Sequence, residues 1–215
     1  MVVGIATVFV TALAVISGFI VSRVLQRQRE GNREEAWRNA RSLSCAFYTF
    51  KDDFGSYPCE DTARLIKDNI PDRSAKLGNV SANDFFRQLI VSGMVDQEKP
   101  FFARSLSSHK PDSVMTDGKL LEKGETGFAY MVSHATCKEE NFPLILTPLV
   151  KGKLLFDYQS ARKCFDGKVI VLSTDGLPNI HIVDKDGHVW IHGKDFFDPS
   201  QPYWHGIPPK VAWPE

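Results

Sequence analysis

The segment DKDGH at residues 184–188 has residue types and a spacing that could hold a cation. Asp184 and Asp186 would supply carboxylate oxygens, and Asp-x-Asp-Gly is a spacing that calcium loops use. An EF-hand loop also needs further oxygen ligands and a glutamate at its end, and both are missing here. The segment therefore predicts a plain hairpin turn, with a calcium site at Asp184 and Asp186 as the alternative.

Three histidines around the same segment suggest a second kind of metal site. His181, His188 and His192, together with Asp184, could form a histidine and carboxylate cluster for a transition metal. Strand alternation would place His188 and His192 on one face, on either side of Trp190 along the chain. Histidines that face solvent on an edge hairpin are the simpler interpretation.

Motifs for catalysis are missing from the sequence. It contains no G-x-S-x-G elbow, no glycine-rich phosphate loop and no HExxH. Ser133-His134 and the scattered aspartates do not make a triad by spacing, because a triad is an arrangement in space. Lys plus Arg and Asp plus Glu both number 26, so no net charge attracts nucleic acid. We expect no enzymatic activity, no nucleic-acid partner, and no cofactor apart from the calcium alternative.

The four cysteines are candidates for disulfide bonds. Cys45, Cys59, Cys137 and Cys164 are an even number, which is compatible with two disulfides in an oxidising compartment. They allow three pairings, and none forms a CxxC or a zinc-ligand spacing with histidine. Free buried thiols are the other interpretation, and the sequence leaves both open.

The N-terminal segment predicts a membrane anchor. Residues 1–22 contain no charged side chain and, as a helix, would span about 30 Å, the hydrocarbon thickness of a bilayer. A cleaved signal peptide normally has a basic start and a shorter apolar centre. We expect a single transmembrane segment at 1–25, with a buried core helix as the alternative. The bilayer is then a partner, and the chain crosses it once.

Two signals disagree about which side of the membrane the rest of the chain faces. Arg23, Arg27, Arg29 and Arg33 all follow the span, and the positive-inside rule would leave the remaining domain in the cytoplasm. The even number of cysteines fits an oxidising compartment instead. Neither signal settles the orientation.

The helical pattern continues beyond the span as a stalk at 26–58, so that Val2 to Phe54 can form one helix. Apolar residues recur at steps of three and four on one narrow face, which we call the seam. The seam consists of Ala36, Ala40, Leu43, Phe47, Phe50 and Phe54. Gly55 and Pro58 end the helix. A two-chain coiled coil would need three or four heptads, more than are present, so we expect the seam to carry the rest of the chain.

Residues 59–215 predict a globular α+β head. Ser81 begins a capped helix that Gly93 ends, and residues 99–126 read as a surface loop. From Gly127 onward, short apolar runs separated by Asp-Gly turns predict an antiparallel sheet. The proline-rich tail is expected to lie over that sheet without adding a strand. The fold class is therefore α+β, with a long N-terminal helix packed on a C-terminal antiparallel sheet.

These features together carry a family resemblance. The apolar span running into RQRE, the helix end AFYTFKDDFGSYP, the run SANDFFRQLIVSGMVDQEKPFFA and the later stretches GFAYM, PLILTPL, FDGKVIVLSTDG and GKDFFDPSQPYW occur in an order that resembles the type IV pilin superfamily. More narrowly, the chain resembles pseudopilins of type II secretion and pilin-like proteins of Verrucomicrobia-type bacteria. Some pseudopilins hold calcium near the C-terminal sheet.

The resemblance implies a structural subunit of a secretion or pilus-like apparatus, in the bacterial inner membrane with its head in the periplasm. Its partners would be other pilin-like subunits or secretion-apparatus proteins. The pilin processing pattern is not matched, because Gly4 is followed by IATVF and the span contains no glutamate. A monomeric membrane-tethered binding module in the periplasm or at the cell surface, without polymerisation, is the alternative function.

Overall fold

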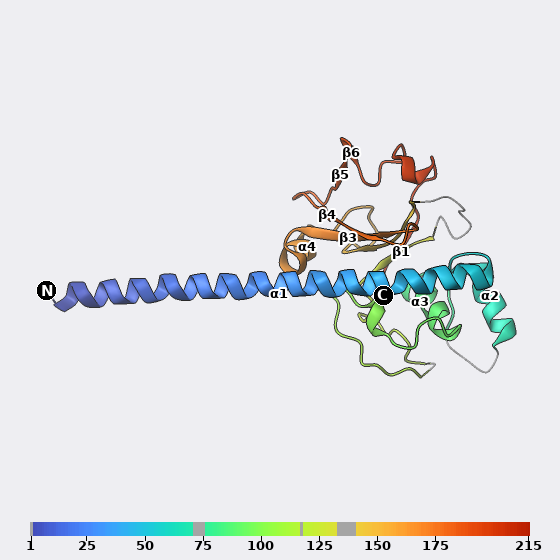
Figure 1. Cartoon of the computed structure of the whole chain (residues 1–215), viewed down its shortest axis with the longest axis horizontal. Helices are drawn as coiled ribbons and strands as arrows, with labels where there is room; N and C mark the ends of the chain where they lie inside the picture. Colours follow the sequence, from blue (N-terminus) through green and yellow to red (C-terminus); the bar gives the residue numbers. More distant parts are fainter. Residues whose placement is uncertain (1, 71–75, 117, 133–140) are drawn as a thin grey trace.

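The computed structural model describes residues 2–70, 76–116, 118–132 and 141–215, and for residues 2–16 it describes the helical backbone without the side chains. Helix α1 runs from Val2 to Phe54, which at about 1.5 Å per residue makes it about 80 Å long. No proline interrupts it, and the chain leaves the helix at Gly55, whose φ of +77° lies in the left-handed region that glycine favours. Figure 1 shows the N-terminal half of α1 protruding from the head.

The head contains an antiparallel sheet of five strands in the order β4-β3-β2-β1-β7. The strands are β1 (Ala129–Met131), β2 (Pro143–Thr147), β3 (Lys168–Ser173), β4 (Pro178–Ile182) and β7 (Val211–Ala212). A separate two-stranded sheet pairs β5 (Trp190–Ile191) with β6 (Lys194–Asp195). The fold is therefore α+β, with a long N-terminal helix and an antiparallel sheet.

Shorter helices surround this framework. They are α2 (Glu60–Asn69), α3 (Ala82–Val91) and α4 (Tyr158–Phe165), with 3₁₀ turns at Lys99–Phe101 and Pro202–Trp204. Ser81 caps α3 as predicted, because its hydroxyl accepts the backbone N–H of Asp84. Helix α4 was not anticipated from the sequence. It begins at the Asp157 cap, which accepts two backbone N–H groups, and Asp166 ends it in the left-handed region.

The central strand β3 is buried on both faces, since its alternate residues enter two different clusters, whereas the edge strand β4 is largely exposed. Ile170 and Leu172 pack in a core shared with α1, α2 and α3. Val169 and Val171 pack in a second core on the other face, together with Trp204 and other aromatic residues of the C-terminal region. Helix α1 thus forms one layer, the sheet the next, and the C-terminal residues the third.

The expectation that the tail adds no strand was wrong. Val211 and Ala212 form β7, which pairs with Met131 and Tyr130 at the edge of the sheet. This pairing is possible because the four residues between Pro209 and Pro214 contain no proline, and an edge strand needs ladder bonds on one side only. The apolar run HVWIH at residues 188–192 also does not join the predicted antiparallel sheet, because β5 pairs with β6 and not with β4.

Candidate functional site

The protruding part of α1 exposes apolar side chains. Residues 17–28 are all exposed, and the large apolar ones are between 43 % and 60 % exposed. They are Phe19, Ile20, Val21, Val24 and Leu25. Apolar side chains gathered on an exposed helix mark a surface that interacts with a partner or with lipid. We therefore treat this protruding helix as the first candidate site.

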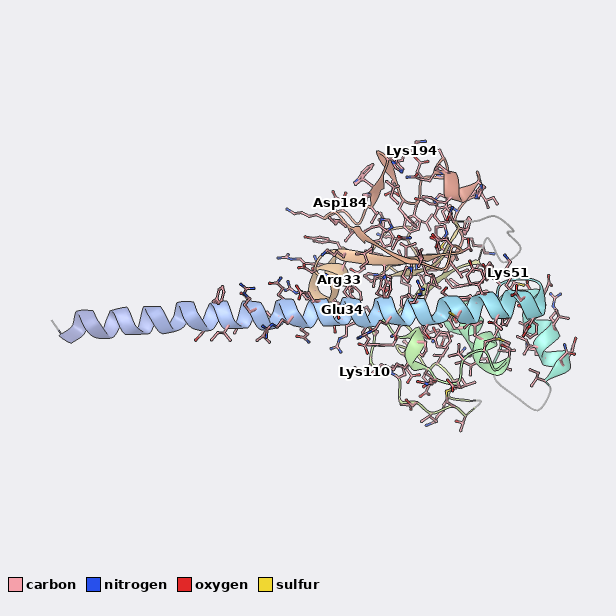
Figure 2. All side chains as sticks on the ribbon, in the orientation of Figure 1. Arg33, Glu34, Lys51, Lys110, Asp184 and Lys194 are labelled. Carbon is pink, nitrogen blue, oxygen red and sulfur yellow. The ribbon has the colours of Figure 1, made fainter. Side chains whose placement is uncertain are left out.

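Basic residues follow the apolar side chains along the helix. The guanidinium of Arg23 lies over the ring of Phe19, 5.1 Å from its centroid. The head begins at Arg29, whose guanidinium lies 4.0 Å from the carboxylate of Asp166 after α4. Figure 2 shows Arg33 and Glu34 where α1 enters the head. The helix therefore passes from an apolar surface through a basic band into the head.

The transmembrane segment expected at 1–25 falls largely on residues 1–16, whose side chains lie outside the described residues.

Within the part of the chain that is described, no helix combines the length and the apolar character needed to cross a membrane.

The seam of α1 holds the head. Its members from Ala36 to Phe50 are at most 1 % exposed, and Phe54 is half-buried against the same core. Phe47 lies at the centre of an aromatic cluster, stacked on Tyr130 with ring centroids 5.9 Å apart and edge-on to Tyr57 and Phe86, each at 6.3 Å. The seam of α1 therefore forms one side of the hydrophobic core of the head. One helix thus joins the protruding surface rigidly to the head.

The DKDGH segment forms a tight turn. Oδ1 of Asp184 accepts the backbone N–H groups of Asp186 and His188 at 3.0 and 2.8 Å, and its Oδ2 accepts the indole N–H of Trp190 at 2.9 Å. The indole bond is the main cause that lowers the pKa of Asp184. Both carboxylate oxygens of Asp184 thus serve the turn itself. The calcium site at Asp184 and Asp186 stays a prediction.

The histidines of the predicted cluster have separate surroundings. His188 Nδ1 lies 2.7 Å from Oδ2 of Asp195, while His181 packs against the ring of Phe196. Burial lowers the pKa of His181. His192 is exposed. The transition-metal interpretation gains no set of three converging donors among the described residues here.

The cysteines are free where the structure describes them. Cys45 is exposed, Cys59 is half-buried and Cys164 is buried, and all three are free thiols. Burial raises the pKa of Cys164. Cys137 and the Ser133-His134 pair lie outside the described residues, so any pairing of Cys137 does too.

Sequence reasoning missed three carboxylates that meet in the 99–126 region. Glu98, Asp112 and Glu125 each offer an oxygen, and these oxygens lie within 4.8 Å of one another. Glu98 and Glu125 are 0 % and 1 % exposed, whereas Asp112 is exposed. No local motif could have revealed them, because each lies in a different part of an irregular segment.

Hydrogen bonds show that these buried carboxylates organise the loop. Oε1 of Glu98 accepts the backbone N–H of Leu121 at 2.7 Å, and its Oε2 accepts a second backbone N–H at 3.1 Å. Glu125 likewise accepts the N–H of Asp112 at 2.9 Å and another at 2.6 Å. Burial raises the pKa of Glu98; the charges of Glu125 and Asp112 act in the same direction, and the backbone hydrogen bonds oppose them. The two carboxylates therefore fix the loop, because they accept backbone N–H groups that have no carbonyl partner in a regular helix or strand.

A hollow of about 380 Å³ opens in the head on the side of this loop. Segments 105–109, 123–129, 148–157 and 213–215 each contribute lining residues. Gly127 allows the second segment to lie against the chain just before the first, because a Cβ at Gly127 would lie 2.0 Å from the backbone oxygen of Ala103. Lys110 follows the lining residue His109 in the sequence, and in Figure 2 it lies on the opposite side of α1 from Asp184. The hollow is the second candidate site.

Comparison of the chain with family models, with curated proteins and with solved structures finds no match in any of the three.

Proposed function

We propose that this protein is a membrane-anchored, pilin-like structural subunit of a type II secretion or type IV pilus-like apparatus. The observation that carries the proposal is the continuity of α1 from Val2 to Phe54. The same helix carries exposed apolar side chains outside the head and the buried seam within it. A helix used in this way transmits any force or displacement at its N-terminal half directly to the head.

The sequence of α1 supports insertion of its N-terminal half into a bilayer. Residues 1–22 contain no charge, and the exposed apolar side chains from Phe19 to Leu25 continue that segment toward the head. Arg23, Arg27 and Arg29 follow at the level where phosphate headgroups would lie. We place the protein in the bacterial inner membrane with its head in the periplasm and its helix beside those of other subunits.

Extraction of bacterial membranes with alkaline carbonate tests the anchor. We expect the full chain to stay with the membrane pellet, because transferring the apolar helix from the bilayer to water is unfavourable. A matched variant that begins at residue 26 keeps the seam and should be released. Release of the full chain together with this control would refute anchoring.

Crosslinking in the membrane tests assembly. The four native cysteines are replaced by alanine, and a new cysteine is placed at Val21 on the protruding helix or, as the control, at exposed Lys119 in the head loop. Helices that pack side by side have axes about 8–10 Å apart, within reach of a short bismaleimide. We expect covalent multimers from Val21→Cys and none from Lys119→Cys.

A monomeric tethered binding module is the second candidate, and the hollow in the head favours it. It predicts a carbonate-resistant chain that yields no multimers from Val21→Cys at any crosslinker length. That combination would replace the subunit proposal while leaving the anchor in place.

A further inference from the structure

The hollow has fixed walls, which a binding site requires. The backbone of Gly124 joins its own wall to two others, because its carbonyl accepts the N–H of His109 at 2.9 Å and its N–H donates to the backbone oxygen of Glu215 at 3.1 Å. Trp213, in the same wall as Glu215, bonds the fourth wall, with its indole N–H donating to the carbonyl of Val150 at 3.1 Å. Asn83 of α3 accepts the backbone N–H of Glu215. Four distant segments are thus locked around one space.

The acidic groups in the lining are already engaged. Both carboxylate oxygens of Asp157 accept hydrogen bonds from the start of α4. Oε1 of Glu215 accepts the hydroxyl of Ser81 at 2.7 Å and lies 3.6 Å from the guanidinium of Arg87. The negative charges of the hollow are therefore directed into the protein's own contacts.

The basic groups in the lining are not engaged in this way. Lys123 and Lys151 line the hollow, and neither ammonium group has a hydrogen-bond or ion-pair partner among the described residues. The ring of His109 faces the backbone carbonyls of Lys110 and Lys123 with Nδ1 and Nε2, at 3.2 and 3.0 Å. Both nitrogens can donate only when the imidazole is protonated. Among the side chains of the lining, the uncompensated charge is therefore positive.

Glycine at position 124 makes room for this histidine. A Cβ there would lie 2.8 Å from Cδ2 of His109, and the φ of Gly124 is +88°. The hydrogen bond to the Lys110 carbonyl is the first cause that raises the pKa of His109, followed by the one to the Lys123 carbonyl; the charges of Glu125 and Asp112 act in the same direction.

Hydroxyl groups and an apolar wall complete the lining. Ser107, Ser108 and Thr126 contribute hydroxyl groups to the lining, and Trp213 and Pro214 contribute an apolar surface. The hydroxyl of Thr126 is buried and has no hydrogen-bond partner among the described residues. A rotation of χ1 to another staggered rotamer would reorient this hydroxyl within the lining. Buried hydroxyls ordinarily have partners, so this one indicates a contact that the described residues do not supply.

We propose that this hollow binds a sugar acid, a hydroxylated ring that carries one carboxylate, such as a uronic-acid unit. Its volume lies at the lower end of the range of about 300–1,000 Å³ for small-molecule sites. Lys123 and Lys151 receive the carboxylate, the hydroxyls of Ser107 and Thr126 bond the ring hydroxyls, and the apolar C–H face of the ring packs on Trp213 and Pro214. The hydroxyl of Ser108 already donates to the carbonyl of Ala103 and accepts the N–H of Ser105, so it can only accept a further bond. Free sugar acids and uronic units within a glycan share this chemistry.

Ligand-observed saturation-transfer NMR on the full chain, in micelles of a detergent without a sugar headgroup, tests the proposal. Glucuronate is compared with three probes: glucose lacks the charge, benzoate lacks the hydroxyls, and acetate lacks both the ring and the hydroxyls. We expect glucuronate to bind at least tenfold more tightly than each of them. Equal affinity of any of the three, or no glucuronate binding, would overturn the proposal.

Variants locate the binding in the hollow. Lys123→Gln and Lys151→Gln should each weaken glucuronate about five- to tenfold, while the loop variant Lys119→Gln, outside the lining, should leave its affinity unchanged. Thr126→Val keeps the shape of the side chain and should weaken glucuronate and glucose by a similar factor. Unchanged melting temperatures show that the variants are folded. Equal loss in all three lysine variants would mean non-specific charge attraction and refute the site.

A second titration separates the two sources of the ligand. An oligosaccharide that ends in a glucuronate unit is compared with free glucuronate on the unmodified chain. Stronger binding of the oligosaccharide identifies a glycan as the partner, and exclusive binding of the free acid identifies a small metabolite. Failure of both would overturn the ligand assignment and would leave the membrane-anchored subunit proposal unaffected, because the carbonate and crosslinking experiments do not involve the hollow.

Discussion

Replacing Phe47 with alanine should remove the main contact between α1 and the head. Phe47 is 1 % exposed and touches three aromatic rings, Tyr57, Phe86 and Tyr130. Phe→Ala at a site that cannot collapse costs about 3–5 kcal/mol, because the transfer free energy of the ring is lost and a cavity remains. The surrounding rings are large and belong to three different segments, so little collapse is expected here. That loss is a large fraction of the roughly 5–15 kcal/mol that stabilises an ordinary domain.

Urea unfolding of the full chain in detergent, followed by tryptophan fluorescence, measures this loss. For a chain of this size the same free energy corresponds to a fall in melting temperature of about 6–20 °C. Phe47→Leu retains most of the apolar volume and should lose less, since what it removes is mainly the ring–ring contribution of about 0.5–1.5 kcal/mol per pair.

The matched control is Arg41→Ala on the exposed face of the same helix. It keeps α1 helical and should change the free energy of unfolding by no more than about 0.5 kcal/mol. If Phe47→Ala and Arg41→Ala have the same midpoint and the same m-value, the seam does not hold the head, and the reasoning that joins the protruding helix to the head is refuted.

Three further predictions concern charged groups of the head. Asp84→Asn should cost about 1.5–3 kcal/mol in urea unfolding, since it removes the nearer of the two carboxylates beside the buried guanidinium of Arg87, at 3.0 Å, and leaves only that of Glu215 at 3.6 Å; a loss near zero would contradict this. Burial raises the folded-state pKa of Glu98 above its usual 4.5, so the unfolding free energy should decrease as pH rises from 4.5 through that raised value, and Glu98→Gln should abolish this dependence. The pKa of His109 is also raised, but here the protonated form carries the charge, so the stabilising contribution is fully present below pH 6.5 and is lost as pH rises through the folded-state pKa. The difference in unfolding free energy between the wild type and His109→Gln should therefore shrink over that interval. A constant difference would argue against a protonated ring.

Much of the fold follows from patterns that are local in the sequence. The period of the seam from Ala36 to Phe54 and the absence of proline predict a helix to Phe54, and the structure ends it there. Ser81 and the apolar residues after it likewise predict α3. The β3–β4 hairpin follows from two apolar runs joined at Asp175-Gly176. Helix periodicity, caps and tight turns are properties of a few consecutive residues, so the sequence alone expresses them.

What remained hidden depends on contacts between distant segments. The two residues of β7 are too few to show a strand pattern, and they become a strand because β1 offers an unpaired edge. The carboxylates of Glu98, Asp112 and Glu125 meet through the path of a loop that has no regular period. The sequence alone therefore determined the long helix α1 and its seam, through interactions between residues within one or two helical turns. Tertiary packing alone decided the hollow, because its four walls come from parts of the chain whose proximity no local pattern encodes.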